Sequence, residues 1–374
     1  MMVFTLIIGI LYLGILGWIF WGSLQIKEFF LEEDASEKTK FSIIIPFRNE
    51  VKNLPELLDS LLKLNYPSEQ FEVIFVDDES EDDSVELVEN NSTSKFQYSI
   101  LKNVRNSNSP KKDAITLAVS KAKYDWIVTT DADCVLPTNW LEVFHSFIIK
   151  KQSLFIAAPV GLNTQKSLIT YYQLFDLLSL QTVTIGSFGA KSPLLCNGAN
   201  LCYKKSVFKD VDGYKGNNHI ASGDDIFLLE KIKKMFPNKI HYLKAKEVIV
   251  KTKTEKNWFQ LIVQRIRWAS KTSTQENVLS KIIGLVVFSC NLLVILGLSI
   301  GFINTNYLSL FLVFWMVKLL VDYLFIIHTA SFFGSKIPFY KFIISSLLYS
   351  IITIIVVIGS LFGSYSWKGR VFKK

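Results

Sequence analysis

Four long apolar segments near the two ends of the chain limit what it can fold into more than any other feature of the sequence. They cover residues 3–21, 282–303, 308–327 and 342–362. Each has about the length of the roughly 20 residues that cross a bilayer as a helix. We therefore predict an N-terminal transmembrane anchor at residues 1–24, about three C-terminal transmembrane helices at residues 279–364, and a folded block between them.

The sequence features that indicate the orientation of these segments in the membrane do not all agree. A signal peptide is the alternative for the first one, but no Lys or Arg precedes it and no small-x-small cleavage site follows it, so we favour an uncleaved anchor. Lys27 comes next and weakly favours a cytoplasmic middle block. The basic tail at residues 365–374 also favours the cytoplasm, whereas one span before the block and three after it would put the tail outside. Either one C-terminal segment does not cross completely, or the tail is an exception.

The middle block, residues 38–278, is long enough for one α/β domain. Apolar runs rich in β-branched residues predict buried parallel strands at residues 41–46, 71–76 and 126–130. Apolar residues at helical spacing predict helices at residues 53–64 and 114–122, with another after Ser84. This alternation predicts a doubly wound sheet with a ligand site at the carboxyl ends of its strands. The four cysteines show no CxxC spacing, which argues against a zinc site or a disulfide framework.

Aspartates follow two of these strands directly. Asp77 and Asp78 come after the second strand, and Asp131 and Asp133 after the third. Carboxylates gathered at one edge of a sheet would repel one another and be costly to desolvate. A divalent cation removes that conflict, and Mg²⁺ or Mn²⁺ takes one or two carboxylates together with substrate phosphates. The structural alternative is that these acids cap helices or lie in solvated loops.

Seven short motifs in this block, taken together, resemble those of family 2 glycosyltransferases, the inverting type that includes cellulose, chitin and hyaluronan synthases. In order, they are "SIIIPFRNE" from Ser42, "VDDESEDDS" from Val76, "KKDAI" from Lys111, "DAD" from Asp131, "NGAN" from Asn197, "SGDDIFL" from Ser222 and "QRIRW" from Gln264. Two positions depart from the family pattern. Pro110 stands where a glycine is usual, and Asp224 stands where the family has glutamate.

The resemblance implies a GT-A fold, which is a Rossmann-like α/β domain, with interfacial helices inside residues 38–278. It also implies nucleotide-sugar contacts at Pro46, Arg48, Glu50, Asp77, Asp78, Lys111 and Asp131. The metal would be held by Asp133, with Asp131 as a second ligand or a ribose contact. Residues toward the acceptor or the diphosphate would be Asn197, Gly198, Asn200, Gln264, Arg267 and Trp268.

The chemistry of such a transfer suits these residue types. Breaking the bond to a diphosphate leaving group puts negative charge on it, which a metal ion and a planar arginine fork such as Arg267 stabilise. Asp225, with Asp224 beside it, matches the catalytic base that takes the proton of the acceptor hydroxyl. The structural alternatives are helix capping for the two aspartates, an interfacial arginine for Arg267 and a bilayer anchor for Trp268.

Two stretches that mix aromatic, aliphatic and polar residues, at residues 165–188 and 257–270, predict interfacial helices, with ordinary packing on the sheet as the alternative. Lys318 and Asp322 lie four residues apart inside a predicted span, so they share a helix face. An ion pair within the helix is one interpretation, and a polar path for the acceptor is the other.

The leading hypothesis is an inverting glycosyltransferase of the cell or inner membrane, multi-pass, with a cytoplasmic catalytic domain and a Mg²⁺ or Mn²⁺ cofactor. It would move a sugar from a nucleotide-sugar donor, most simply a UDP-sugar, to a lipid-linked or glycan acceptor and form a β-linkage. One alternative is a processive polysaccharide synthase, which QxxRW favours but the small number of spans does not. Another is a non-catalytic nucleotide-binding membrane scaffold. We expect membrane lipids and export or polymerisation proteins as partners, and no nucleic acid.

Overall fold

The computed structural model describes residues 2–31, 37–91, 95–163, 167–218, 220, 222–271, 277–362 and 365–372. The chain forms two compact units. The globular unit consists of Ile26–Asn163 and Leu195–Lys253, and the helical unit consists of Met1–Gln25, Thr164–Leu194 and Thr254–Lys374.

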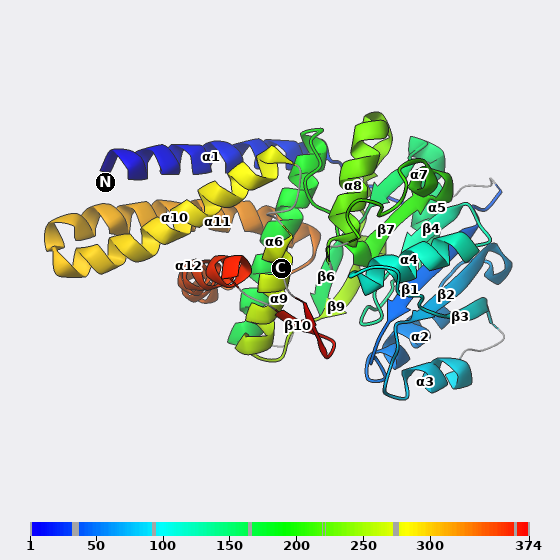
Figure 1. Cartoon of the computed structure of the whole chain (residues 1–374). Helices are drawn as coiled ribbons and strands as arrows, with labels where there is room; N and C mark the ends of the chain where they lie inside the picture. Colours follow the sequence, from blue (N-terminus) through cyan, green and yellow to red (C-terminus); the bar gives the residue numbers. More distant parts are fainter. Residues whose placement is uncertain are drawn as a thin grey trace. The chain divides into compact units, whose positions relative to one another are not determined.

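A seven-stranded sheet is the centre of the globular unit (Figure 1). Its strands are β1 (Phe41–Phe47), β2 (Phe71–Asp77), β3 (Gln97–Lys102), β4 (Trp126–Thr129), β5 (Phe155–Ala157), β7 (Leu201–Lys204) and β8 (Ile240–Tyr242), in the order β3-β2-β1-β4-β7-β5-β8. Strands β1 to β4 pair in parallel, whereas β7 is antiparallel to both β4 and β5. The predicted α/β fold with a doubly wound sheet of parallel strands is confirmed, and the antiparallel strand is a feature that the sequence pattern did not indicate.

The remaining elements of the globular unit cover the sheet or close its edges. The helices are α2 (Leu54–Leu62), α3 (Ser84–Asn91), α4 (Pro110–Lys121), α5 (Trp140–Lys151), α7 (Lys205–Asp210) and α8 (Asp224–Met235). A second small sheet pairs β6 (Val160–Asn163) with β9 (Val250–Lys253) in parallel. Strand β1 and the face of α2 that includes Leu54, Leu57 and Leu61 belong to one buried apolar core, so the spacing of the leucines gives α2 its inward face.

The helical unit contains six helices and one hairpin among the described residues. The helices are α1 (Met2–Gln25), α6 (Leu168–Gly189), α9 (Trp258–Ser270), α10 (Val278–Ile303), α11 (Leu308–Phe332) and α12 (Phe339–Phe362). Strands β10 (Tyr365–Trp367) and β11 (Arg370–Phe372) form an antiparallel hairpin. Four helices, α1, α10, α11 and α12, are long and apolar enough to cross a membrane, in agreement with the four apolar segments of the sequence.

Helices α1 and α6 approach each other at two glycines. A Cβ atom on Gly22 would lie 2.1 Å from the carbonyl oxygen of Gly186, and one on Gly186 would lie 2.2 Å from the carbonyl oxygen of Ile19. Backbone atoms cannot yield as a flexible side chain can, so both positions require glycine. Close backbone contact of this kind is a usual way for apolar helices to associate in lipid.

The charged pair inside α11 is an ion pair within the helix. Lys318 Nζ lies 2.6 Å from Asp322 Oδ2, and the hydroxyl of Tyr12 on α1 donates to Asp322 Oδ1 at 2.6 Å. Lys318 is 4% exposed, so the pair lies inside the bundle. Of the two interpretations of these residues, the structure supports mutual neutralisation of a buried lysine and a partly buried aspartate.

Candidate active site

The carboxyl ends of β1, β2 and β4 place the predicted site residues at one edge of the sheet. Phe47 at the end of β1 is in register with Asp77 at the end of β2. The next peptide continues this alignment, because the backbone N–H of Asp78 donates to the carbonyl of Phe47 at 2.9 Å. On the other side of β1, the N–H of Thr130 after β4 donates to the carbonyl of Ile44 at 3.2 Å. The parallel pairing therefore brings the loops after three strands side by side, as expected for a doubly wound sheet.

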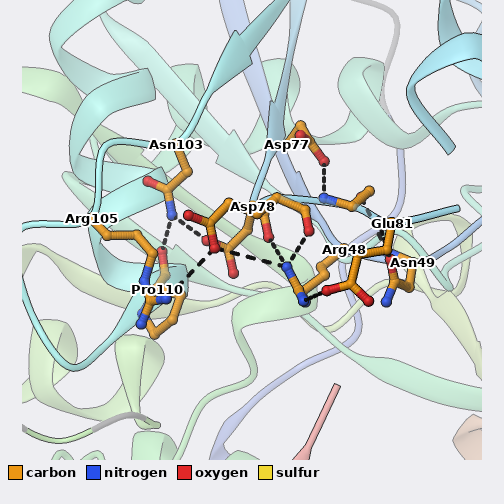
Figure 2. A network of polar contacts seen from close by, with 10 residues as sticks. Arg48, Asn49, Asp77, Asp78, Glu81, Asn103, Arg105 and Pro110 are labelled. Carbon is orange, nitrogen blue, oxygen red and sulfur yellow. Dashed lines mark hydrogen bonds and ion pairs between the residues drawn. The ribbon is translucent and has the colours of Figure 1, made fainter. Parts of the chain in front are cut away.

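Arg48 organises the loop that follows β2 (Figure 2). Its guanidinium donates to the backbone carbonyl of Asp78 at 2.8 Å and to that of Glu79, and it pairs with the Glu81 carboxylate at 2.7 Å. The Asp77 carboxylate accepts from the N–H of Ser80 at 2.9 Å, which closes the turn. These contacts hold the loop in shape before any ligand is present.

The second aspartate of this loop connects it to the next loop of the sheet edge. Asp78 is 6% exposed and accepts a hydrogen bond from Asn103 Nδ2 at 2.8 Å, and the same amide donates to the carbonyl of Pro110 at 3.0 Å. Figure 2 shows Asn103 between Asp78 and Pro110. Pro110 is the first residue of α4, where a proline costs no hydrogen bond, which explains how the chain tolerates it in place of the family's glycine.

Two further predicted residues of the first motif lie close to this loop. Glu50 is 8% exposed and accepts from Asn53 Nδ2 at 2.6 Å, and its own N–H donates to Ser84 at 2.7 Å. Pro46 lies within β1, half-buried, opposite Val76 of β2. Both residues therefore shape the loop after β1, and a direct contact with the nucleotide stays a prediction.

A lysine joins the acids that follow β4 to those that begin α8. Lys111 Nζ lies 2.6 Å from Asp131 Oδ1 and 3.2 Å from Asp224 Oδ2. Burial acts to lower the pKa of this lysine, but Asp131, Asp224 and Asp225 together raise it above its ordinary value. Lys111 is therefore a permanent cation at the centre of the site.

Gly198 brings the "NGAN" segment against the same cluster. A Cβ atom at this position would lie 2.7 Å from Asp224 Oδ2 and 3.4 Å from Lys111 Nζ. Its backbone N–H donates to Asp225 Oδ2 at 3.3 Å. The structure thus gathers Lys111, Asp131, Asp224, Asp225 and Gly198, which are predicted site residues from four separate motifs. A side chain at Gly198 would displace one of the charged groups.

Asn200 and Asn197 stabilise the "NGAN" segment by hydrogen bonds. Asn200 is fully buried, its amide donates to the carbonyls of Pro159 and Val248 at 2.8 Å each, and its oxygen accepts from Trp140 Nε1 at 2.9 Å. Asn197 caps the turn by accepting from the N–H of Ala199 at 3.0 Å. The structure therefore gives Asn200 a positioning role, because contact with an acceptor would require it to leave three partners.

The two predicted metal ligands offer oxygen donors of the right kind. Asp131 is about one-third exposed at its side chain, and Asp133 Oδ2 accepts from Thr252 Oγ1 at 3.1 Å. Among the described residues, no group of three His, Cys, Asp or Glu side chains is arranged to hold a metal ion. Two carboxylates suit Mg²⁺ or Mn²⁺ when substrate phosphates and water complete the coordination, so the donor set fits a cation that arrives with the substrate.

The QxxRW residues lie on α9, in the helical unit. Gln264 donates to Glu255 Oε1 at 2.8 Å and accepts from Arg265. Arg267 and Trp268 are half-buried. These three predicted residues belong to the helical unit and the Lys111 cluster belongs to the globular unit, so their contact with an acceptor or a diphosphate stays a prediction.

Sequence reasoning missed the residue that supports Trp268. The guanidinium of Arg265 lies 4.1 Å from the centroid of the Trp268 ring, and Arg265 Nε pairs with Asp176 Oδ2 on α6 at 2.5 Å. The signal was present, because Asp176 is the single acid of an otherwise apolar or neutral helix and such a charge needs a cationic partner.

A second missed residue is Lys112. It is 1% exposed and donates to the carbonyls of Asn217 and Ile220 at 2.7 and 2.9 Å, and its ammonium lies 4.6 Å from the ring centroid of Phe227. It therefore ties the start of α4 to the segment that leads into Asp224 and Asp225. Sequence reasoning assigned a role only to the neighbouring Lys111, because the family motif requires one lysine there, and left Lys112 without a role.

Comparisons with known proteins define the class of this domain. Residues 42–212 match the model of glycosyl transferase family 2. A poly(ribitol-phosphate) beta-N-acetylglucosaminyltransferase of Staphylococcus aureus is 32% identical over 114 residues, which are 30% of this chain and 20% of that protein. An undecaprenyl-phosphate 4-deoxy-4-formamido-L-arabinose transferase of Pseudomonas savastanoi is 33% identical over 130 residues, covering 34% of this chain and 37% of that protein. The matches thus span well under half of these relatives.

A solved structure agrees over almost the whole chain. The mannosyltransferase of Pyrobaculum calidifontis, in complex with GDP-Man and Mn²⁺, superposes with a TM-score of 0.58 at 16% identity and covers 96% of this chain and 98% of that one. At this identity the likeness shows the fold alone. The fold is thus a GT-A fold with attached apolar helices. Residues 42–212 of this chain, which contain five of the seven motifs, are a glycosyl transferase family 2 domain, as the resemblance predicted.

Proposed function

We propose that this protein is a membrane-bound inverting glycosyltransferase that moves a sugar from a nucleotide-sugar donor to a hydroxyl of a lipid-linked or glycan acceptor and forms a β-linkage. The observation that carries the proposal is the cluster in which Lys111 contacts Asp131 and Asp224 while Asp225 meets the N–H of Gly198. It joins the acid motif that follows β4 with the acid pair that begins α8, which are the donor and the base motifs of the family.

In the proposed reaction, Asp225 accepts the proton of the acceptor hydroxyl as that oxygen attacks the anomeric carbon. The new carbon–oxygen bond forms as the bond to the diphosphate breaks, and the electron pair leaves with the diphosphate oxygen. Attack from the face opposite the leaving group inverts the anomeric carbon, so an α-linked donor yields a β-linkage. Carboxylate bases of this kind contribute about 10²- to 10⁴-fold to the rate.

The other residues hold the donor in this scheme. Arg48 and Asp78 shape the loop that receives the nucleoside, and Lys111 keeps positive charge beside the diphosphate. Asp133 and Asp131 would hold a Mg²⁺ or Mn²⁺ ion, which when bound supplies positive charge to the leaving group. A structural relative bound to GDP-Man and Mn²⁺ supports a nucleotide-sugar donor with a divalent cation. Gln264, Arg267 and Trp268 would contact the acceptor or the diphosphate.

The acceptor is proposed from the membrane helices and from the relatives. Four apolar helices tether the enzyme to lipid, which favours an acceptor that is itself anchored there. One relative is named for undecaprenyl phosphate and another for a poly(ribitol-phosphate) polymer. We place the catalytic domain in the cytoplasm, where charged nucleotide sugars are made. The processive alternative rests on the QxxRW sequence of α9, and product length distinguishes it from a single transfer.

The test is a donor survey with purified protein in detergent. Release of nucleoside diphosphate is measured from a panel of UDP- and GDP-sugars with Mg²⁺ or Mn²⁺, with and without a lipid extract. Turnover with one donor that falls at least about 100-fold in Asp225→Asn supports the assignment. Asp210→Asn, an exposed acid at the end of α7, is the matched control and should keep full activity. Donor binding without turnover under all conditions would instead support a non-catalytic scaffold.

A further inference from the structure

Chain connections indicate which helix ends of the helical unit share the membrane side of the globular unit. Both ends of α6 continue into the globular unit, at Asn163 and at Leu195, so this 22-residue helix does not cross a bilayer. Helix α9 follows directly from the globular unit at Lys253. The water-exposed globular unit, α6 and the start of α9 therefore belong to one side of the membrane.

Helices α10 and α11 cross and return. They are joined at their far ends by the short connection that contains Thr305–Tyr307. The last turns of α11 come back to α6, since Thr329 Oγ1 and Thr182 Oγ1 lie 2.7 Å apart in a hydrogen bond. The chain thus reaches the end of α11 on the side from which α10 started, and α12 begins there.

Helix α12 contacts α6 and α9, the two helices next to the globular unit in the chain, from near its start to near its end. Near its start, the Phe342 ring lies 5.5 Å from that of Phe175 on α6. Near its end, a Cβ atom on Gly359 would lie 2.6 Å from Ile266 Cδ1 on α9. A helix that crossed beside α11 would move away from α6 and α9 by about 1.5 Å per residue, or roughly 30 Å in 20 residues. Both ends of α12 instead meet the helices of the starting side.

Figure 1 agrees with these contacts. Helices α1, α10 and α11 run across the view, whereas α12 is seen nearly along its axis. The hairpin strand β10, which follows α12, contacts α9 as well.

The depth of α12 follows from the two spanning helices that it touches. Ser350 Oγ donates to Asn291 Oδ1 on α10 at 2.9 Å, and the Phe342 ring lies 5.3 Å from that of Tyr323 on α11. At 1.5 Å per residue, Asn291 is roughly 20 Å along α10 from Val278, and Tyr323 is roughly 14 Å from the end of α11 at Phe332. Helix α12 therefore lies below the membrane surface, within the hydrocarbon.

The two faces of α12 suit this position. Six large side chains on one face are exposed in the structure, namely Tyr340, Ile344, Ile351, Ile355, Ile358 and Phe362. The opposite face is buried and rich in small polar residues, including Ser346, Ser350 and Ser360. The exposed apolar face continues the lipid-facing surfaces of the spanning helices, so acyl chains are its partner. The hydropathy that makes α12 look like a span also fits a helix lying in lipid, because a helix satisfies its own backbone hydrogen bonds.

We propose that α12 is a helix that lies within the hydrocarbon without crossing it and has both ends toward the side from which α10 starts, so that the chain crosses the membrane three times rather than four. The hairpin β10–β11 and the basic tail then lie on the same side as the globular unit. This resolves the conflict between an even number of spans and a basic C-terminus, since Lys and Arg favour the cytoplasmic side.

The test uses single cysteines in the full-length protein and a membrane-impermeant maleimide on sealed vesicles of each orientation. The four native cysteines are buried, so the parent chain measures the background. Cysteines are introduced at Lys63 in the globular unit, Thr305 between α10 and α11, Lys336 between α11 and α12, and Lys368 in the hairpin turn. We expect Lys63→Cys, Lys336→Cys and Lys368→Cys to label from one side and Thr305→Cys from the other.

Labelling of Lys368→Cys from the side of Thr305→Cys would mean that α12 crosses, and would overturn the proposal. Protease cleavage of a peptide tag placed after Lys374 gives a second readout that needs no substitution within the chain. The tag should be cut only in vesicles that also expose the globular unit. Both readouts are independent of transferase activity, so failure of the proposed function and failure of this inference are distinguishable.

Discussion

Two lysine–aspartate pairs of this protein, one in each unit, have the same length and opposite roles. Lys111–Asp131 in the globular unit and Lys318–Asp322 in the helical unit both measure 2.6 Å. Lys318 finds its partner four residues away on one helix, with a tyrosine hydroxyl on the other oxygen of the carboxylate. Lys111 collects aspartates from two distant motifs. The Lys318 pair neutralises charge among apolar helices, and the Lys111 pair gathers carboxylates around one cation.

This difference distinguishes an ion pair that stabilises the fold from a charged cluster that can bind a ligand. A one-to-one pair with both carboxylate oxygens occupied is complete and has nothing to offer a ligand. A lysine that contacts Asp131 and Asp224, with Asp133 on the same loop as Asp131, gathers carboxylates from separate motifs at one place. Such a site gains from an arriving divalent cation, as the membrane pair does not.

The largest expected effect that separates the two pairs concerns stability. Lys318→Met should lower the unfolding free energy by up to about 3–5 kcal/mol, because it leaves the partly buried Asp322 without its cation. The double variant Lys318→Met/Asp322→Asn removes both charges and should recover most of the loss. Thermal unfolding in detergent measures both. A single variant as stable as the parent, or a double variant no better than the single one, would contradict the neutralising role.

The next effect concerns activity. Lys111→Met should reduce kcat/KM by about 10- to 100-fold, since a hydrogen bond to a charged group contributes roughly 1.5–3 kcal/mol. Steady-state release of nucleoside diphosphate measures it. Lys121→Met, exposed at the other end of α4, is the matched control and should behave like the parent. If Lys111→Met lowered stability and left turnover unchanged, the two pairs would be alike after all.

The smallest effect lies in the support of Trp268. Arg265→Lys keeps a cation beside Asp176 but loses the planar group that stacks on the indole, so we expect a loss of about 0.5–1 kcal/mol, or roughly 2- to 5-fold. The KM for the acceptor should rise while the KM for the donor stays constant. Gln260→Ala, on the exposed face of α9, serves as control. Equal changes in both KM values would mean that Arg265 acts only on the stability of α9.

Several features of the fold could be predicted because they depend on local pattern. Runs of β-branched residues predicted the strands at Phe41–Phe47 and Phe71–Asp77, and length and composition predicted the four apolar helices. The short strands β5, β7 and β8 could not be predicted in this way. Three or four residues carry too little periodicity, and their pairing comes from distant partners such as Lys204 with Trp126.

The candidate site, too, has features that the sequence predicted and features that only the structure showed. Motif order was enough to name Lys111, Asp131, Asp224 and Asp225 as members of one site, because short motifs keep their residue types in the chain itself. Only the tertiary structure showed that Lys111 joins the two acid motifs and that Asn200 is buried next to them. It also showed that Lys112 and Arg265 hold neighbouring segments.

The sequence alone establishes a family 2 glycosyltransferase domain and four helices apolar enough to enter a membrane, since residue type and hydrophobic length are properties of the chain. The direction in which each apolar helix runs is not such a property. Helices α11 and α12 are similar in length and hydropathy, yet α11 meets α6 near its end, at Thr329, whereas α12 meets α6 near its start, at Phe342, and α9 near its end, at Gly359. Hydrophobicity places a helix in lipid, and the contacts between side chains of different helices determine how it lies there.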